Sequence, residues 1–518
     1  MSLLTPKIAR GFTGEPCPPR FNLARYCLAR AAAETPAKTA LIVVSDATAP
    51  LEDAEHWTYG ELDEAVRRIA AGLFAEGFRP GERLMIRMPN TSDYALLFFG
   101  AIAAGLVPLP SSSMLTEAEA DFLLTDSHAV AVAVSGDLAV HAGKARVIDD
   151  AMLVRLKAHA PLGDYADTEA NDPAFLVYTS GTSGRPKGVL HAQRSAWGRR
   201  PMYQGWYGIG ASDIVLHAGA FNWTYTLGVG LQDPWANGAT TVLYIGPKDV
   251  HVWPNLLERT RATLFAAVPT LYRQILKYCD LASHDLSALR HGLTAGEALS
   301  PVLLRHWREE TGKNLYEALG MSECSTYIST GPSMEIRAGS PGKPQPGRCV
   351  AVLPVDGGTE PLPAGETGML AVHRSDPGLM LGYWQRPGDE SEVYRGEWFI
   401  GGDLASFDDD GYLWYHGRAD DVMNAMGYRV SPAEVEAALS DHPGIAEVAV
   451  TEMHVRDDVT VIAAFVVPKD GKQPDRASIF AHAEERLAAY KRPREIVFVE
   501  SLPRTANGKV MRRTLAAR

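Results

Sequence analysis

Cysteine is scarce in this chain, and its spacing gives it no evident structural role. Five cysteines are spread over 518 residues, and no two of them form a C-x-x-C pair. A disulfide framework or a zinc site is therefore not expected, and the usage is typical of the reducing cytoplasm. The N-terminus lacks a cationic segment followed by an apolar one, and no run of about 18 apolar residues occurs. The sequence thus predicts neither a signal peptide nor a membrane span.

An excess of positive charge is also missing. The chain has 50 Lys and Arg against 62 Asp and Glu, which gives a formal net charge of −12. Nucleic acids and anionic membranes bind basic surfaces, so neither is an expected partner, although a local anion pocket is compatible with this charge. The content of 46% hydrophobic and 22% charged residues is typical of a globular protein, and the length has room for about three domains.

The most informative stretch follows the apolar segment Ala174–Tyr178, which is typical of a short buried strand. Glycines allow backbone N–H groups to turn inward around an anion, hydroxyls add donors, and a lysine adds a point charge. The stretch therefore predicts a phosphate-binding loop; a flexible Ser/Gly linker is the less favoured alternative, because linkers rarely follow an apolar strand. Its residues are Thr179, Ser180, Gly181, Thr182, Ser183, Gly184, Arg185, Pro186, Lys187 and Gly188.

This loop differs from the common nucleotide-binding loop with the pattern G-x-x-x-x-G-K-[ST]. Counted from Gly181, the second glycine position is Pro186, and Lys187 is followed by Gly188 instead of Ser or Thr. No side-chain hydroxyl follows the lysine to hold magnesium. The metal ligand must therefore come from another part of the chain.

The loop resembles the signature loop of the adenylate-forming superfamily, which comprises acyl- and aryl-CoA synthetases, luciferases and peptide-synthetase adenylation domains. In that family the loop wraps the phosphates of ATP while a carboxylate attacks the α-phosphorus. A second motif, Pro503–Lys509, resembles the family's C-terminal Pro-x-Thr-x-x-Gly-Lys. The resemblance extends from the region of Thr58 to Lys509, and it implies ATP, Mg²⁺ and coenzyme A as the small molecules bound.

The resemblance also assigns roles to residues of this sequence. Lys509 neutralises the substrate carboxylate and the α-phosphate, Glu323 in the Gly-x-Thr-Glu-like segment Gly320–Glu323 holds magnesium, and Ser322 binds the α-phosphate. Asp420 is the hinge about which the last hundred or so residues turn between two half-reactions. The nucleoside site comprises Ala295, Gly296, Glu297, Ala298, Leu319 (where the family often has Tyr), Asp403 and Arg418, and the CoA loop comprises Gly427, Tyr428 and Arg429.

The acid is expected to bind between apolar walls with few polar groups, which suit a benzene ring or a medium alkyl chain. Acetate-specific relatives have a Trp where this chain has Gly320, so this pocket is left open. Packing of the same aromatics in the core is the alternative interpretation. The expected pocket residues are Phe221, Trp223, Thr224, Tyr225, Ala267, Ala318 and Gly320.

Alternating strand and helix patterns predict an α/β fold with mostly parallel sheets. We expect a large N-terminal domain over residues 1–419, doubly wound and with a small β-barrel-like subdomain at about 340–415, then a mobile α+β domain over 420–518. Residues 151–172 are expected to be a connector. Two segments, Thr58–Glu61 and Ser431–Glu434, each have the pattern of a helix capping box.

Together these features predict a cytoplasmic, ATP-dependent carboxylic acid–CoA ligase. It forms acyl-AMP and pyrophosphate and then acyl-CoA and AMP, with an aromatic, benzoate-like or medium-chain acid as substrate. Two alternatives stay open, namely an adenylating enzyme that loads a separate carrier protein and a non-catalytic nucleotide or acyl sensor. The sequence gives no oligomeric state.

Overall fold

The computed structural model describes residues 11–136, 138, 142–180, 186–247, 249–419, 423–425, 428–456, 459–487, 489, 491–504 and 510–516. Within these residues no helix is both long and apolar enough to cross a membrane. The helices are α1 (Leu23–Glu34), α2 (Tyr59–Ala75), α3 (Ser92–Ala103), α4 (Glu117–Asp126), α5 (Asp150–Lys157), α6 (Arg200–Met202), α7 (Thr224–Leu227), α8 (Asp233–Ala236), α9 (Val252–Thr260), α10 (Pro269–Tyr278), α11 (Pro301–Thr311), α12 (Pro387–Glu392), α13 (Pro432–Ser440), α14 (Arg476–Arg486) and α15 (Arg512–Ala516).

The largest sheet has nine strands, and six neighbouring strands at its centre run parallel. A parallel sheet of this kind needs helical crossovers, which the alternating sequence pattern predicted. In spatial order the strands are β15 (Lys343–Pro344), β14 (Ser325–Ser329), β13 (Asn314–Met321), β12 (His291–Ala295), β11 (Leu264–Ala266), β9 (Ile214–His217), β10 (Thr240–Tyr244), β1 (Thr39–Val44) and β2 (Glu55–Thr58).

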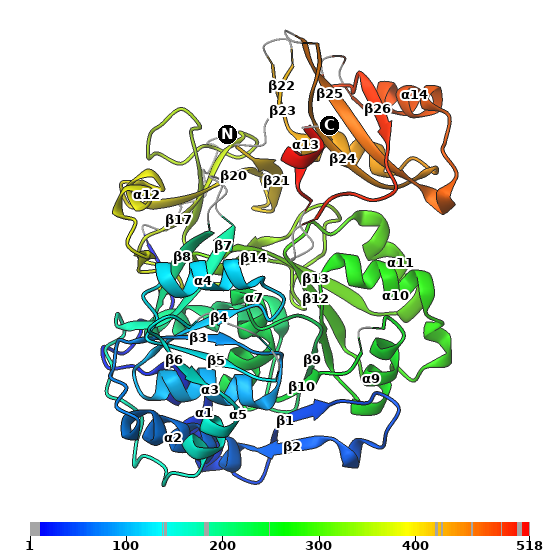
Figure 1. Cartoon of the computed structure of the whole chain (residues 1–518). Coiled ribbons are helices and arrows are strands. Elements are labelled where there is room, and N and C mark those ends of the chain that lie inside the picture. The colour runs from blue at the N-terminus through cyan, green and yellow to red at the C-terminus, as the bar shows by residue number, and fades with distance from the viewer. Residues whose placement is uncertain are drawn as a thin grey trace.

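A second, fully parallel sheet and a small antiparallel sheet complete this part of the molecule (Figure 1). Both faces of such parallel sheets are usually covered, and β4 and β5 here are buried along their whole length. The parallel sheet has the order β4 (Val107–Ser111), β3 (Arg83–Arg87), β5 (Ala131–Val134) and β6 (Arg146–Ile148), and the antiparallel one has the order β18 (Gly382–Tyr383), β8 (Pro186–Ala192) and β7 (Pro173–Ser180).

The β-rich segment forms an antiparallel sheet of β16 (Val350–Leu353), β17 (Gly368–His373), β20 (Trp398–Phe407) and β19 (Tyr394–Arg395), with β21 (Leu413–Arg418) against β20. The hairpin β22 (Met423–Ala425) and β23 (Tyr428–Val430) follows it. The last sheet consists of β24 (Ile445–Arg456), β25 (Val459–Pro468) and β26 (Glu495–Phe498), with α13 and α14 beside it at the top of Figure 1. The α/β class, the β subdomain and the α+β C-terminal unit are thus confirmed.

The predicted capping boxes have different outcomes. At α2, the Thr58 hydroxyl accepts from the N–H of Glu61 and the Glu61 carboxylate accepts from the N–H of Thr58, as predicted. At α13, the Ser431 hydroxyl instead donates to the carbonyl of His416 and caps nothing. The Glu434 carboxylate there pairs with Lys491, so this second prediction was wrong.

The predicted connector 151–172 was also wrong in part, because it contains most of helix α5. The carboxylate of Asp149 caps this helix by accepting from the N–H of Met152 at 2.7 Å. Met152, Leu153 and Leu156 are buried on its inner side. The helix packs on α2 at Gly72, where an added Cβ would meet Leu156, so the two helices approach closely.

Candidate active site

Several predicted site residues lie at the carboxyl edge of the nine-stranded sheet, where parallel sheets bind ligands. On neighbouring strands there, His217 ends β9 opposite Ala266, the last residue of β11, and Ala295 ends β12 opposite Ala318 of β13. The turn that begins at Gly296 directly follows β12, and Ser322 and Glu323 directly follow β13. The fold therefore brings the predicted nucleoside turn and the predicted metal carboxylate together on adjacent strands.

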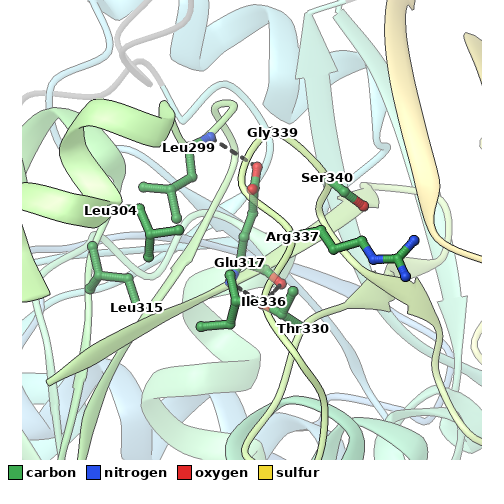
Figure 2. A pocket seen from close by; sticks show the side chains of 9 residues that line it. All are labelled: Leu299, Leu304, Leu315, Glu317, Thr330, Ile336, Arg337, Gly339 and Ser340. Atoms are coloured by element: carbon green, nitrogen blue, oxygen red, sulfur yellow. Dashed lines mark hydrogen bonds between the residues drawn. The ribbon is translucent and has the colours of Figure 1, made fainter.

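Two side chains hold the turn after β12. Glu297 accepts from the Thr270 hydroxyl at 2.8 Å, and the N–H of Leu299 donates to the Glu317 carboxylate at 2.9 Å. Glu317 is buried beside a small cavity of about 10 Å³ that Leu299, Leu304 and Thr330 help to line (Figure 2). Burial raises the pKa of Glu317 to about 7. No sequence motif marks Glu317, because it is a single Glu within a strand.

Glu323 is half-buried and is fixed through both its backbone and its side chain. Its carbonyl accepts from the N–H of Met380, and its Oε1 accepts from the Tyr383 hydroxyl, each at 2.7 Å. Tyr383 lies on β18, which pairs with β8 opposite Val189. The carboxylate predicted to hold metal is therefore tied to the small sheet that carries the phosphate loop.

The predicted phosphate loop joins β7 and β8, in which Thr179 stands opposite Lys187. The ammonium of Lys187 is 2.9 Å from the Asp389 carboxylate and 5.3 Å from the centre of the Tyr383 ring. Loop residues Gly181, Thr182, Ser183 and Gly184 and the side chain of Ser180 lie outside the described part of the chain. The Lys187–Asp389 pair is a feature that the sequence did not predict.

Asp403 and Arg418 are directly opposite each other on β20 and β21. The guanidinium of Arg418 lies 3.8 Å from Oδ1 of Asp403 and donates to the carbonyl of Gly401 at 2.6 Å. The Tyr415 hydroxyl donates to the same Oδ1 at 3.1 Å. The cross-strand register thus brings together two residues, 15 positions apart in the sequence, that the family resemblance assigns to the nucleoside site.

The predicted acid pocket is brought together only in part. Tyr225, Ala295 and Ala318 share one hydrophobic cluster, and Trp223 packs against it. A Cβ added at Gly296 would lie 3.8 Å from the Trp223 ring, so that ring is beside the nucleoside turn. Leu319 is half-buried at the edge of another cluster.

Four other predicted pocket residues have different surroundings. Phe221 is fully buried against Tyr94, with the ring centres 5.6 Å apart, and Ala267 packs with the cluster on the opposite side of the sheet. Thr224 lines a second small cavity next to Arg199. At Gly320 any side chain would collide with the backbone of Ser325, so close approach of β13 and β14 requires glycine there. Phe221 and Ala267 thus pack in the core, and their contact with the acid stays a prediction.

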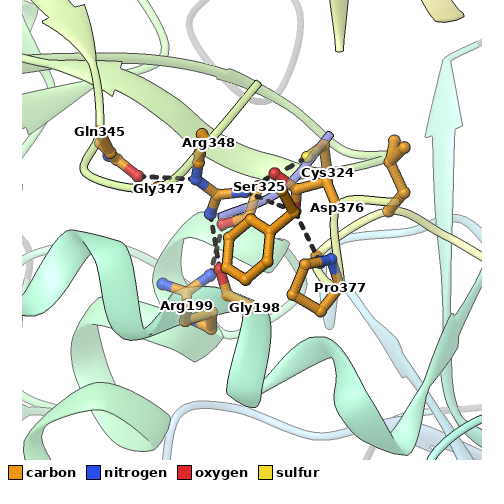
Figure 3. Close-up of polar contacts among 12 residues, drawn as sticks. Gly198, Arg199, Cys324, Ser325, Gln345, Gly347, Arg348, Asp376 and Pro377 are labelled. Carbon is orange, nitrogen blue, oxygen red and sulfur yellow. Dashed lines mark hydrogen bonds and ion pairs between the residues drawn. The ribbon is translucent and has the colours of Figure 1, made fainter. Parts of the chain in front are cut away.

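Two buried arginines support the turn that follows Glu323 (Figure 3). Arg199 forms two hydrogen bonds with Asp233, at 2.8 and 2.6 Å, and donates to the hydroxyl of Ser325, whose φ of +65° is left-handed. Arg348 donates to both oxygens of Asp376 at 2.7 Å. Such paired, fully hydrogen-bonded charges are tolerated in a core, and here they fix the chain beside Glu323.

The predicted mobile unit is described only in part. Lys509, Asp420 and Gly427 lie outside the described residues, as do the side chains of Tyr428 and Arg429, whose backbone forms β23. Arg504, five residues before Lys509, pairs with Glu447 at 2.7 Å and lies 3.9 Å from Glu297 of the nucleoside turn. Arg504 therefore lies beside the predicted nucleoside turn.

Comparison with known proteins identifies the family of this chain. The family model described as AMP-binding enzyme matches residues 28–384, and the model of the AMP-binding enzyme C-terminal domain matches residues 434–509. A benzoate–CoA ligase of Thauera aromatica is 33% identical over 485 residues, 90% of this chain and 91% of that protein. The human mitochondrial acyl-coenzyme A synthetase ACSM5 is 32% identical over 492 residues, 89% of this chain and 83% of that protein.

A solved structure has the same architecture. The benzoate CoA ligase from Burkholderia xenovorans LB400 superposes with a TM-score of 0.85 at 32% identity, covering 96% of this chain and 100% of that one. The chain therefore belongs to the AMP-binding enzymes of the adenylate-forming superfamily, in the acyl- and aryl-CoA synthetase branch, whose members are AMP-forming acid–thiol ligases.

Proposed function

We propose that this ligase activates an aromatic, benzoate-like acid, with medium-chain acids as the second candidate class. The observation that supports this is the wall formed by Trp223 and Tyr225 beside Ala295 and Ala318 at the carboxyl edge of the sheet. Flat aromatic faces next to small residues are surroundings that suit a planar ring. The relatedness to benzoate–CoA ligases supports the same class of acid.

In the first half-reaction, a carboxylate oxygen of the acid attacks the α-phosphorus of ATP, and the bond to the β-phosphate oxygen breaks to release pyrophosphate. No base is required, because the nucleophile is already an anion, so the protein contributes positioning and charge neutralisation. We assign the β- and γ-phosphates to the loop from Thr179 to Lys187, the α-phosphate to Ser322, and the ribose to Asp403 and Arg418. Lys509 lies between the two reacting anions in this scheme.

The residues at the proposed ATP site include a carboxylate suited to binding magnesium. Glu323 offers a half-buried carboxylate with one oxygen held by Tyr383, a hard ligand of the kind that Mg²⁺ prefers. Bound there, the ion would offset phosphate charge. Glu297, Gly296, Ala298 and Leu319 are assigned to the adenine side of the same site.

In the second half-reaction, the thiolate of coenzyme A attacks the acyl carbon and AMP leaves. We assign residues 1–419 and 420–518 to two domains that change their relative orientation at Asp420 between the steps. The loop at Gly427, Tyr428 and Arg429 then faces the acyl site and admits the thiol. The cytoplasmic location stays a prediction from cysteine usage.

Pyrophosphate release measured over benzoates and C2–C12 acids, with and without CoA, tests the function. We expect release with a benzoate and thioester formation with free CoA. Release without a thioester would instead support loading of a carrier protein. No release with any acid, while ATP still binds, would leave the sensor alternative and contradict the proposal.

The role of Lys509 is tested by separating the half-reactions. Lys509→Ala is expected to abolish adenylation while sparing thioester formation from supplied acyl-adenylate, because the acid carboxylate and the α-phosphate that Lys509 would neutralise react with each other only in the first step. Asp420→Pro is expected to impair the thioester step more than adenylation. Equal loss of both half-reactions in Lys509→Ala, or an unchanged rate ratio in Asp420→Pro, would contradict these assignments.

A further inference from the structure

Two buried polar atoms at the acid-binding edge of the sheet have no hydrogen-bond partner among the described residues. They are Nε2 of His217 and the hydroxyl oxygen of Tyr225. His217 is 3% exposed and Tyr225 is 9% exposed. A buried polar atom without a hydrogen-bond partner costs free energy. Two such atoms at a proposed ligand site therefore indicate that a polar group of the ligand forms the missing hydrogen bonds.

The two side chains face the same region. Along β9, His217 is two residues from Val215, so both project from the same face of the sheet. Val215, Ala266, Ala295, Ala318 and Tyr225 all belong to the cluster that forms the proposed acid wall. The rings of His217 and Tyr225 meet edge to face with centres 5.8 Å apart.

The hydrogen-bonding character of His217 follows from its other nitrogen. The N–H of Gly219 donates to Nδ1 at 3.0 Å, which places the hydrogen of a neutral imidazole on Nε2. Burial lowers the pKa of His217 to about 3, so the ring is neutral at pH 7. Nε2 therefore offers an N–H donor, and Tyr225 offers an O–H that donates or accepts.

We propose that His217 and Tyr225 select an aromatic acid whose ring carries a hydrogen-bond-accepting oxygen substituent, such as a hydroxyl, over the unsubstituted acid. This rests on the proposed function and narrows its substrate class. A ring hydroxyl accepts from Nε2–H of His217 and exchanges a hydrogen bond with the Tyr225 hydroxyl. An unsubstituted ring leaves both protein groups without a hydrogen-bond partner. The free-energy cost of these two buried, unpaired groups lowers the affinity for the unsubstituted acid.

The test compares kcat/KM for pyrophosphate release with benzoate and with 2-, 3- and 4-hydroxybenzoate. At least one hydroxybenzoate is expected to exceed benzoate by about tenfold or more in the parent enzyme. Tyr225→Phe and His217→Asn are expected to lower that ratio severalfold, because only the hydroxybenzoate loses a hydrogen bond. His217→Asn keeps an oxygen near Nδ1 to accept from Gly219, and His217→Gln, which restores a donor near Nε2, is expected to recover part of the ratio.

Tyr272→Phe is the matched control. Tyr272 is also fully buried against this sheet, but its hydroxyl donates to the carbonyl of Phe265 at 2.6 Å, so its removal is expected to lower stability without changing the ratio. Melting temperature and binding of each acid by calorimetry in the presence of ATP identify a variant that has merely unfolded. Preference of the parent for benzoate over all three isomers, or equal losses for both acids in the variants, would overturn the inference. Absence of pyrophosphate release with every acid would instead contradict the proposed function.

Discussion

The Tyr383 hydroxyl donates to Oε1 of Glu323 at 2.7 Å, and the ring of the same tyrosine lies 5.3 Å from the ammonium of Lys187. One side chain thus contacts the carboxylate assigned to magnesium and the cation assigned to phosphate. These two residues are 136 positions apart in the chain. Tyr383 reaches both residues because its strand β18 pairs with β8, which includes the last residues of the predicted phosphate loop.

Tyr383→Phe is expected to weaken binding of the Mg²⁺–ATP complex severalfold while changing kcat less. The ring that faces Lys187 is kept, but the carboxylate loses the hydrogen bond that orients it. Calorimetric titration with ATP at several magnesium concentrations measures this. Tyr412→Phe is the control, since its hydroxyl donates to the carbonyl of Glu335 at 2.8 Å, away from Glu323. Equal effects of both substitutions would show that Tyr383 has only a structural role.

Asp389→Asn is expected to lower KM for ATP by about twofold to fivefold, because Lys187 no longer pairs with a carboxylate that competes with phosphate. The side chains of Lys187 and Asp389 are 20% and 34% exposed, so salt should shrink the effect. Glu392→Gln removes the same charge from an exposed position on the same helix. A rise in KM for Asp389→Asn would mean that Asp389 aligns Lys187 instead of competing for it.

Ionisation of Glu317 should lower the free energy of unfolding of the protein as pH rises. Its pKa in the folded state is about 7 against an ordinary value of 4.5, so the folded state binds more protons between these pH values. The stabilisation is complete below about pH 4.5 and is lost as pH rises through about 7. Glu317→Gln stays neutral and still accepts from the N–H of Leu299, so its free energy of unfolding, relative to the parent, should rise by roughly 2–3 kcal/mol from pH 5 to pH 8.

Urea unfolding at pH 5, 6, 7 and 8 measures this slope. Glu317→Ala is the companion variant, because it leaves the buried N–H of Leu299 unpaired and should be less stable than the parent at pH 5. A pH slope that is the same in the parent and in Glu317→Gln would assign the titration to another group.

Gly228→Ala is expected to destabilise the protein by about 3–5 kcal/mol, since the added methyl group would occupy the place of the Arg199 guanidinium and break its buried pair with Asp233. Thermal and chemical unfolding measure the loss. Gly210→Ala is the control, because an added Cβ there has no neighbour within 4 Å. Near-parent stability of Gly228→Ala would mean that Arg199 can move without losing Asp233.

The sequence by itself determined the class of fold and the chemistry. Apolar strands alternating with amphipathic helices suffice for an α/β sheet, and Lys187 with its glycines and hydroxyls is a local pattern that indicates phosphate binding. The capping box at Thr58 is equally local, because its two partners are three residues apart. Such features depend on neighbouring residues and are readable without knowing where the chain goes.

Only the tertiary structure decided which residues meet across the chain. Ser431 has the local sequence pattern of a helix cap, yet its hydroxyl donates a hydrogen bond to the carbonyl of His416. Phe221, predicted to line the acid pocket, packs on Tyr94, whereas His217, which no motif marked, ends a strand beside Ala266 at the carboxyl edge of the nine-stranded sheet. Strand order and register set these contacts, and they arise from pairing between segments far apart in sequence, which composition and periodicity do not encode.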